Sequence, residues 1–169
     1  EVRRYMMMNR PEDAAHLFVD YWSGAGAWES FPDFRRRNLA EREFPVSKIH
    51  AIASRRSVGR EVSFGDSIVK CEDLEQFDFS KVDFVLMSAG GTISKEWSPR
   101  IGKTGALVID NSSAWRYDQD VPLIVPEVNA HVLEQYMARA GRKNIIANPN
   151  CSTAQLVVAL KPLHDAARI

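Results

Sequence analysis

The sequence predicts an α/β fold built on a mostly parallel sheet covered by helices. From about residue 46 onward, short apolar runs rich in β-branched residues alternate with amphipathic or polar stretches, and this alternation is typical of a parallel sheet. The length of 169 residues is enough for one domain with its own core. The expected strands are residues 48–53, 84–88, 106–110, 123–125 and 144–147.

The segments between these strands predict one hairpin and three helices. Residues 61–64 and 67–70 alternate apolar and polar side chains around Gly65-Asp66, the pattern of a small antiparallel hairpin. Leu156, Leu160 and Leu163 share one face of the last helix, and Pro162 is expected to bend or interrupt it. The expected helices are residues 95–103, residues 130–140 after an Asn129 cap, and the stretch from Ser152 onward.

The composition describes a soluble globular protein. Lys and Arg number 22, as do Asp and Glu, so the formal net charge is zero. The basic excess typical of nucleic-acid binding is missing, and no nucleic-acid partner is expected. The longest apolar stretches, such as residues 156–160, fall far short of the roughly 20 residues that span a bilayer, so no membrane association is expected.

Cysteine and histidine usage points to a cytoplasmic protein without a metal site. Cys71 and Cys151 cannot form a disulfide framework, and their spacing does not suggest zinc binding. The four histidines have no spacing that suggests metal ligation, and the N-terminal residues lack the apolar core of a signal peptide. Residues 17–19 and Gly24-Ala25-Gly26 give only a weak phosphate-binding signal, because the third glycine of G-x-G-x-x-G is missing.

The feature richest in chemistry is the run from Asn148 to Thr153, which follows an apolar strand and precedes a helical pattern. A cysteine at a helix N-terminus meets unpaired N–H groups and the helix dipole, which favour the thiolate. Asn150 and the first-turn amides could donate to an oxyanion formed when Cys151 attacks a carbonyl carbon, so the pattern fits acyl transfer. In the alternative interpretation, Cys151 is an ordinary small buried residue and Ser152 caps the helix.

Several motifs accompany this cysteine. They are Phe44-Pro45, Ala53-Ser54-Arg55-Arg56-Ser57 with Gly59, Ser88-Ala89-Gly90-Gly91, Asp110-Asn111-Ser112-Ser113-Ala114-Trp115-Arg116, Val125-Pro126-Glu127-Val128-Asn129, and Asn148-Pro149-Asn150-Cys151-Ser152-Thr153. In their order and approximate spacing, over about residues 39–169, the chain resembles the aspartate-semialdehyde dehydrogenases.

The resemblance implies a Rossmann-like sheet with helices on both faces. It also implies an oxidoreductase that reduces L-aspartyl 4-phosphate with NADPH, releasing phosphate and L-aspartate 4-semialdehyde. Members of the family feed the synthesis of lysine, methionine, threonine, isoleucine and, in bacteria, diaminopimelate. A small-molecule substrate and a homodimer are further expectations from the resemblance.

The same resemblance assigns roles at the substrate end. Cys151 matches the nucleophile that forms a thioacyl intermediate, and Asn150 would help to hold the acyl oxygen or the phosphate. Arg116 matches the arginine that grips the phosphate, because its fork of donors suits a phosphate better than a lysine does. Asn111 is expected near the cofactor or the phosphate. The alternatives are a solvent-facing Arg116 and an Asn111 that caps its own turn.

The cofactor residues follow two of the expected strands. Ser54 and Arg56 stand where a dinucleotide fold meets the adenosine ribose, and a hydroxyl with an arginine accommodates a 2′-phosphate, which favours NADP over NAD. Ser88, Ala89 and Gly90 close another strand, where glycines let the backbone approach a cofactor. The alternatives are a solvated basic turn at Arg56 and an ordinary strand-to-helix turn at Gly90.

The chain departs from the family at both ends. We expect the family's first strand and glycine loop to be lost or replaced in residues 1–38, which form an atypical segment. Residues 39–150 are expected to form the NADP-binding domain, and residues 151–169 the start of a truncated second, α+β domain for catalysis and dimerisation. We expect the acid/base histidine and the substrate clamp of the family to lie in that second domain, so that the chain alone turns over poorly.

Two other functions remain open. N-acetyl-glutamyl-phosphate reductases also use a cysteine and NADPH on an acyl phosphate, but they typically carry glycine where Asn150 stands. The other alternative is a catalytically silent fragment that binds only a nucleotide or a partner chain.

Overall fold

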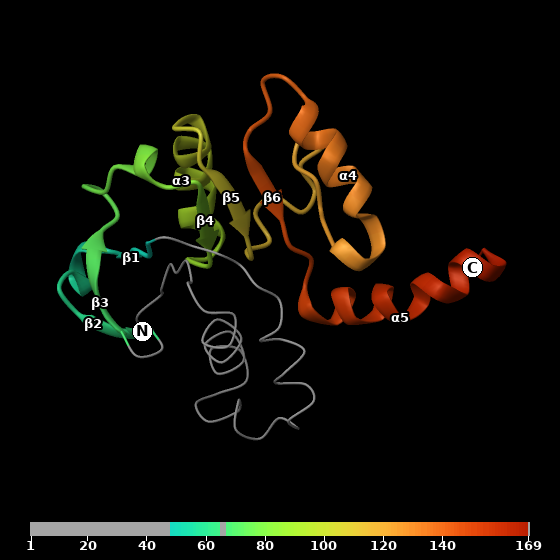
Figure 1. Cartoon of the computed structure of the whole chain (residues 1–169), viewed down its shortest axis with the longest axis horizontal. Coiled ribbons are helices and arrows are strands. Elements are labelled where there is room, and N and C mark those ends of the chain that lie inside the picture. The colour runs from blue at the N-terminus through green and yellow to red at the C-terminus, as the bar shows by residue number, and fades with distance from the viewer. Residues whose placement is uncertain (1–47, 65–66, 169) are drawn as a thin grey trace. The chain divides into compact units, whose positions relative to one another are not determined.

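The structure is a computed structural model that describes residues 48–64 and 67–168. The chain divides into two compact units, Glu1–Phe77 and Asp78–Ile169, and each is described by itself (Figure 1). The atypical segment expected over residues 1–38 lies outside the described residues, and the expected domain boundaries stay predictions.

The first unit contains a three-stranded sheet in the order β1-β3-β2. β1 is Ala51–Ala53, β2 is Glu61–Phe64 and β3 is Ser67–Asp73. The expected hairpin is confirmed, because β2 and β3 pair antiparallel. β3 runs three residues past its expected end, since Cys71 to Asp73, beyond the hairpin, pair parallel with β1. Ala51, Ala53, Val62 and Cys71 form the buried cluster of this unit.

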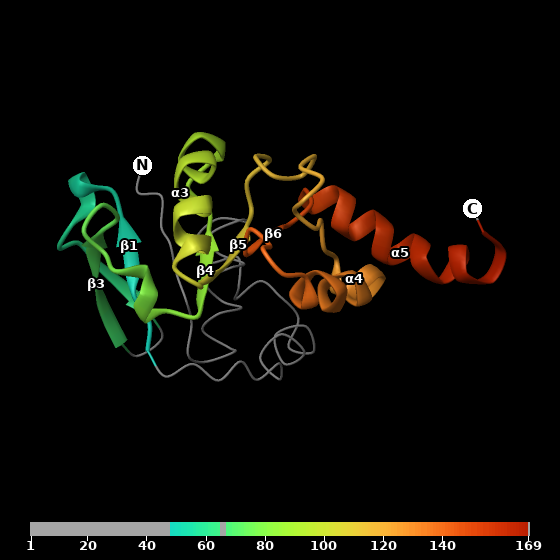
Figure 2. The same ribbon diagram turned by 90° about the horizontal axis from the view of Figure 1, so that it is seen from above.

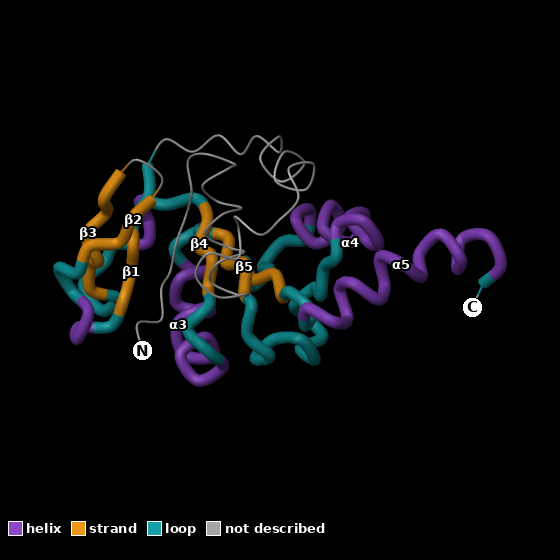
Figure 3. Tube along the Cα trace, turned by 90° about the horizontal axis from the view of Figure 1, so that it is seen from below, coloured by secondary structure: helices purple, strands orange, loops and turns teal. Residues whose placement is uncertain are grey.

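The second unit alternates strands and helices along the chain (Figure 3). Its strands form a parallel sheet in the order β4-β5-β6. The elements are β4 (Phe84–Met87), α3 (Gly91–Lys103), β5 (Leu107–Asp110), α4 (Pro126–Ala138), β6 (Ile145–Ala147) and α5 (Cys151–Ala167). The expected α/β fold is therefore confirmed.

Helices cover both faces of this sheet (Figure 2). On one face, the side chain of Asp110 in β5 contacts Ser98 of α3. Side chains alternate along a strand, so Leu107 points to the opposite face, where it packs with Ile146 against Tyr136 of α4. The helices thus remove water from both sides of β5, as a parallel sheet requires.

Residues 123–125 do not form the expected strand. Leu123 makes one isolated bridge to Ala147, and the Ile124 N–H donates to the Ala147 carbonyl over 3.0 Å. The run is too short for more, because α4 begins at Pro126, a residue with φ already suited to a first helical position.

The expected helix starts were also late. α3 begins at Gly91 rather than at residue 95. The expected helix start after Asn129 is confirmed in part, because α4 consists of two helical segments that meet at a kink at Asn129, whose backbone angles are non-helical. The Asn129 side chain bonds backward, accepting from the Val125 N–H and donating to the Leu123 carbonyl. Its amide therefore braces the preceding loop.

α5 continues through Pro162 to Ala167, so the expected interruption does not occur. Pro162 removes one N–H, whose helical acceptor would be the Val158 carbonyl. Val158 is exposed, so water can reach that part of the helix. Leu156 and Leu163, expected on one face, are both exposed, and no helix among the described residues is long and apolar enough to cross a membrane.

An ion pair joins the β5–α4 connection to the residues before β6. The Lys143 ammonium donates to both carboxylate oxygens of Asp118, over 2.9 and 2.7 Å. This hydrogen bond, with a smaller effect from the Asp120 backbone N–H, holds the pKa of Asp118 below its ordinary 3.8 against the opposing effect of burial.

The pair predicts a pH-dependent stability. Because the pKa of Asp118 is lower in the folded chain, its contribution is present above pH 3.8 and is lost as the pH falls through the folded-state value. Asp118→Asn should lower the free energy of unfolding by ~0.5–1 kcal/mol near neutral pH, and by less as the pH falls below the ordinary pKa. Urea unfolding across this range measures the effect.

The matched controls are Lys143→Gln and the double variant. If the two side chains act on each other, the double variant loses no more stability than either single variant. An Asp118→Asn effect that does not shrink in acid would contradict the prediction.

Candidate active site

The parallel register brings the loops after β4, β5 and β6 to one edge of the sheet. The Asn111 N–H donates to the Met87 carbonyl over 2.9 Å, and the Asn148 N–H donates to the Asp110 carbonyl over 2.8 Å. Beyond the strands, the Asn148 amide donates to the Asn111 side-chain oxygen over 2.5 Å. Asn111 therefore links two loops instead of capping its own turn, which Asp110 does by accepting from the Ser112 N–H.

Arg116 is fixed between these loops. Its Nε donates to the Asn148 carbonyl over 2.9 Å and its Nη2 to the Asn111 carbonyl over 3.1 Å. The residue is partly buried, so the solvent-facing alternative is wrong. Among the described residues, Nη1 has no hydrogen-bond acceptor. The guanidinium is thus held through Nε and Nη2, and Nη1 is left to bind a ligand.

Cys151 is the first residue of α5 and is exposed. The alternative of an ordinary buried cysteine is therefore wrong. The helix cap is Asn150 rather than Ser152, because the Asn150 Oδ1 accepts from the Thr153 N–H over 2.9 Å. That bond orients the Asn150 amide, and its Nδ2 has no acceptor among the described residues. An exposed thiol thus adjoins an amide donor, as acyl transfer requires.

The loop after β4 fits the approach of a cofactor. Gly90 has φ 87°, which a glycine adopts without strain, and it precedes α3 without a side-chain cap. The first N–H groups of α3 are therefore available to an anionic or polar group. Ser88, Ala89 and Gly90 form this turn, so the turn interpretation and the cofactor interpretation are both compatible with it.

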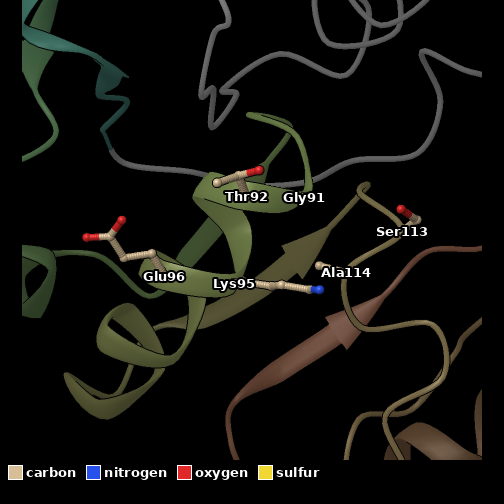
Figure 4. A pocket seen from close by; sticks show the side chains of 6 residues that line it. All are labelled: Gly91, Thr92, Lys95, Glu96, Ser113 and Ala114. Carbon is tan, nitrogen blue, oxygen red and sulfur yellow. The ribbon is translucent and has the colours of Figure 1, made fainter.

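A pocket of about 560 Å³ opens beside the start of α3. Figure 4 shows the Lys95 side chain extending from α3 toward Ala114 on the β5–α4 connection. The lining residues are Gly91, Thr92, Lys95, Glu96, Ser113 and Ala114. Glycine, small polar side chains and a cation suit part of a dinucleotide.

Ser54 and Arg56 lie in the first unit, directly after β1. Both are exposed, and Arg56 belongs to a 3₁₀ turn, Arg55–Ser57, whose end is closed by the Ser57 N–H donating to the Ser54 carbonyl over 2.8 Å. A solvated basic turn and a 2′-phosphate site both fit this geometry. No cluster of three His, Cys, Asp or Glu side chains that could hold a metal ion occurs in the part of the chain that the structure describes.

The family described as "Semialdehyde dehydrogenase, NAD binding domain" matches residues 35–136. The chain belongs to this family. Membership agrees with the parallel sheet and with a nicotinamide cofactor.

Individual relatives carry a more specific name. The chain is 49% identical over 131 residues to aspartate-semialdehyde dehydrogenase 2 of Vibrio cholerae. The matched region covers 78% of this chain and 38% of the relative. The chain is 51% identical over 133 residues to aspartate-semialdehyde dehydrogenase of Aquifex aeolicus, with the same coverage. The chain thus spans well under half the length of the curated relatives that it matches.

Solved structures that resemble this chain carry the same enzyme name as the relatives. The crystal structure of aspartate semialdehyde dehydrogenase II complexed with ASA from Vibrio cholerae has a TM-score of 0.71 and 47% identity, covering 79% of this chain and 42% of that one. The Candida albicans enzyme with NADP has a TM-score of 0.54 and 27% identity, covering 70% of this chain and 39% of that one.

The sequence interpretation of this semialdehyde dehydrogenase domain missed the buried support of the site. The sequence motifs contain Asp110 and Asn148 but indicate no role for them, and no pattern points to Ser94 or Ser98. In the structure, Ser94 and Ser98 donate hydrogen bonds to Asp110. Asn148 is hydrogen-bonded to Arg116 and Asn111. The available signal was polar residues at the buried end of a strand and on the inner face of a helix.

The two cysteines should differ sharply in reactivity. Cys151 is exposed and Cys71 is 4% exposed, so iodoacetamide should modify Cys151 about 10-fold faster or more in the native chain. Mass spectrometry of the peptides after timed quenching measures both rates.

Urea is the control, because unfolding should bring the two rates together. Equal rates in the native chain would contradict the exposed placement of Cys151.

Proposed function

We propose that this protein is an aspartate-semialdehyde dehydrogenase. It reduces L-aspartyl 4-phosphate to L-aspartate 4-semialdehyde, with NADPH as reductant and phosphate as the leaving group. The observation that carries the proposal is the exposed Cys151 at the start of α5. Arg116 is held by the carbonyl of Asn148, which lies between β6 and α5. The names of the relatives support the substrate.

The side chains divide the chemistry between them. The Cys151 sulfur attacks the acyl carbon, a carbon–sulfur bond forms and the carbon–oxygen bond to phosphate breaks. The nicotinamide cofactor supplies the hydride. After its transfer to the thioester carbon, the carbon–sulfur bond breaks and the aldehyde leaves.

Two donors stabilise the charges of this reaction. The Asn150 Nδ2 donates to the acyl oxygen, where negative charge develops as the sulfur attacks. The Arg116 Nη1 binds the phosphate, and the two carbonyls that hold the rest of the guanidinium keep it oriented before the substrate arrives. Asn111 supports this arrangement through Asn148.

We propose NADP as the nicotinamide cofactor. Ser54 and Arg56 are exposed directly after β1 and offer a hydroxyl and a cation to a 2′-phosphate. Ser88, Ala89 and Gly90, with the uncapped start of α3, receive another part of the dinucleotide. We further propose, from the family resemblance, a cytoplasmic enzyme that works as a homodimer.

The function can be tested in the reverse direction. The purified chain is mixed with L-aspartate 4-semialdehyde, NADP⁺ and inorganic phosphate, and the absorbance of NADPH is followed. Cys151→Ser should lower the rate to that of the mixture without protein, because the nucleophile is lost. Cys71→Ser is the matched control and should keep the activity, since Cys71 is buried in the first unit.

A second measurement reads the chemistry without full turnover. With semialdehyde and NADP⁺ but no phosphate, mass spectrometry should find the acyl group on Cys151. N-acetyl-glutamate semialdehyde as the better substrate would favour the reductase alternative. If the chain shows no turnover and forms no adduct, the result favours a catalytically silent chain. That outcome would refute the proposal for the protein as given.

The cofactor proposal makes a separate prediction. Arg56→Met should weaken NADPH binding about 10- to 100-fold and leave NADH binding unchanged, because only the 2′-phosphate loses its cation. Energy transfer from tryptophan to the nicotinamide measures both affinities. Arg55→Met, in the same turn, is the control, and equal losses for NADPH and NADH would contradict the assignment.

A further inference from the structure

Asp110 is a fully buried carboxylate at the end of the central strand β5. Its Oδ2 accepts from the hydroxyls of Ser94 and Ser98 on α3, the latter over 3.1 Å, and its Oδ1 accepts from the Ser112 N–H over 2.6 Å. No Lys, Arg or His among the described residues forms an ion pair with it. The group is satisfied by neutral donors alone.

These bonds tie three segments together. Ser94, itself fully buried, also accepts from the Trp115 Nε1 over 2.7 Å, and its hydroxyl lies 3.3 Å from that of Ser98. Helix α3, the end of β5 and the loop that carries Trp115 and Arg116 therefore share one buried polar network. Such a network specifies one arrangement of its members, because any shift leaves a buried polar group without a partner.

Asp110 is hydrogen-bonded to both segments that supply acceptors to Arg116. Its side chain fixes the turn at Asn111 and Ser112, and the Asn111 carbonyl accepts from Arg116 Nη2. Its own carbonyl accepts from the Asn148 N–H, and the Asn148 carbonyl accepts from Arg116 Nε. Asp110 thus contacts both segments that orient the guanidinium, one through its side chain and the other through its backbone carbonyl.

The stability of the fold does not by itself explain why a carboxylate is buried at position 110. Burying a carboxylate is unfavourable, and apolar residues of similar volume often serve a core as well or better. A carboxylate is useful where a turn must be held in one orientation by several directional bonds at once.

We propose that Asp110 is a positioning residue that acts through Arg116, fixing the direction in which its Nη1 is offered to an oxyanion. That this anion is the substrate phosphate rests on the proposed function. Ser94 and Ser98 belong to the same device, because they hold the carboxylate from the side of α3.

The test reads Arg116 directly. In the ¹⁵N-labelled chain, the Arg116 Nε–H resonance is assigned by its loss in Arg116→Lys, and its hydrogen exchange is measured with that of the β5 and β6 amides. Asp110→Asn keeps the Oδ1 acceptor for Ser112 but places an NH₂ group against two hydroxyls. We expect the Nε–H to exchange about 10-fold faster, with the strand amides unchanged, because the turn that carries Asn111 and Arg116 is held less firmly.

Titration with inorganic phosphate adds a second readout. Asp110→Asn should weaken phosphate binding, read from the phosphate-induced shift of the Arg116 signal, by about 10-fold. In an Arg116→Lys background, where binding is read from the backbone amide signals of Asn111 and Asn148, Asp110→Asn should have no further effect. Ser98→Ala, which removes one bond, should act in the same direction but less and covers the case that Asp110→Asn fails to fold. Asp120→Asn, an exposed carboxylate in the same connection, is the matched control and should change nothing at Arg116.

The outcomes separate the two proposals. An unchanged Arg116 exchange rate, or a rate that rises together with the strand amides, overturns the positioning role. A wild-type Arg116 signal that does not respond to phosphate removes the phosphate part of the proposed function, while the exchange measurement still decides the role of Asp110.

Discussion

The parallel pairing of β5 with β6 is the constraint on which the candidate site depends. The register places Asp110 opposite Ala147, so Asn111 and Asn148 leave the sheet side by side at its carboxyl edge and their side chains meet. Arg116 can bridge the two loops only because their carbonyls are presented together. A slip of one residue would turn Asp110 to the face of α4 and away from its donors on α3.

Polar groups beneath the edge make the site rigid before any ligand binds. Loops that follow strands carry backbone groups without ladder partners, and burying them unpaired is unfavourable. Here Arg116 and Asp110 satisfy several of these groups at once. The ordering entropy of the loop is therefore lost on folding rather than on binding, which favours tight recognition of a small anion.

The sequence predicted the elements whose signal is local. β4, β5 and β6 follow from continuous apolar runs, and the last helix from the strand before it and the spacing of Leu156, Leu160 and Leu163. Residues 123–125 have the same composition but only one bridging partner, so composition could not exclude a strand there. The role of Asp110 could not be predicted, because Ser94 and Ser98 lie 16 and 12 residues earlier and meet it only once α3 packs on the sheet.

The motif from Asp110 to Arg116 joins structure and chemistry in seven residues. Asp110 anchors to α3, the Ser112 hydroxyl accepts from the Ala114 N–H, Trp115 donates to Ser94, and Arg116 grips two carbonyls. Several of its polar atoms are therefore bound within the fold, and the Arg116 Nη1 is a donor with no acceptor among the described residues. A site with few, fixed donors selects a ligand by geometry more than by charge, which agrees with a chain whose net charge is zero.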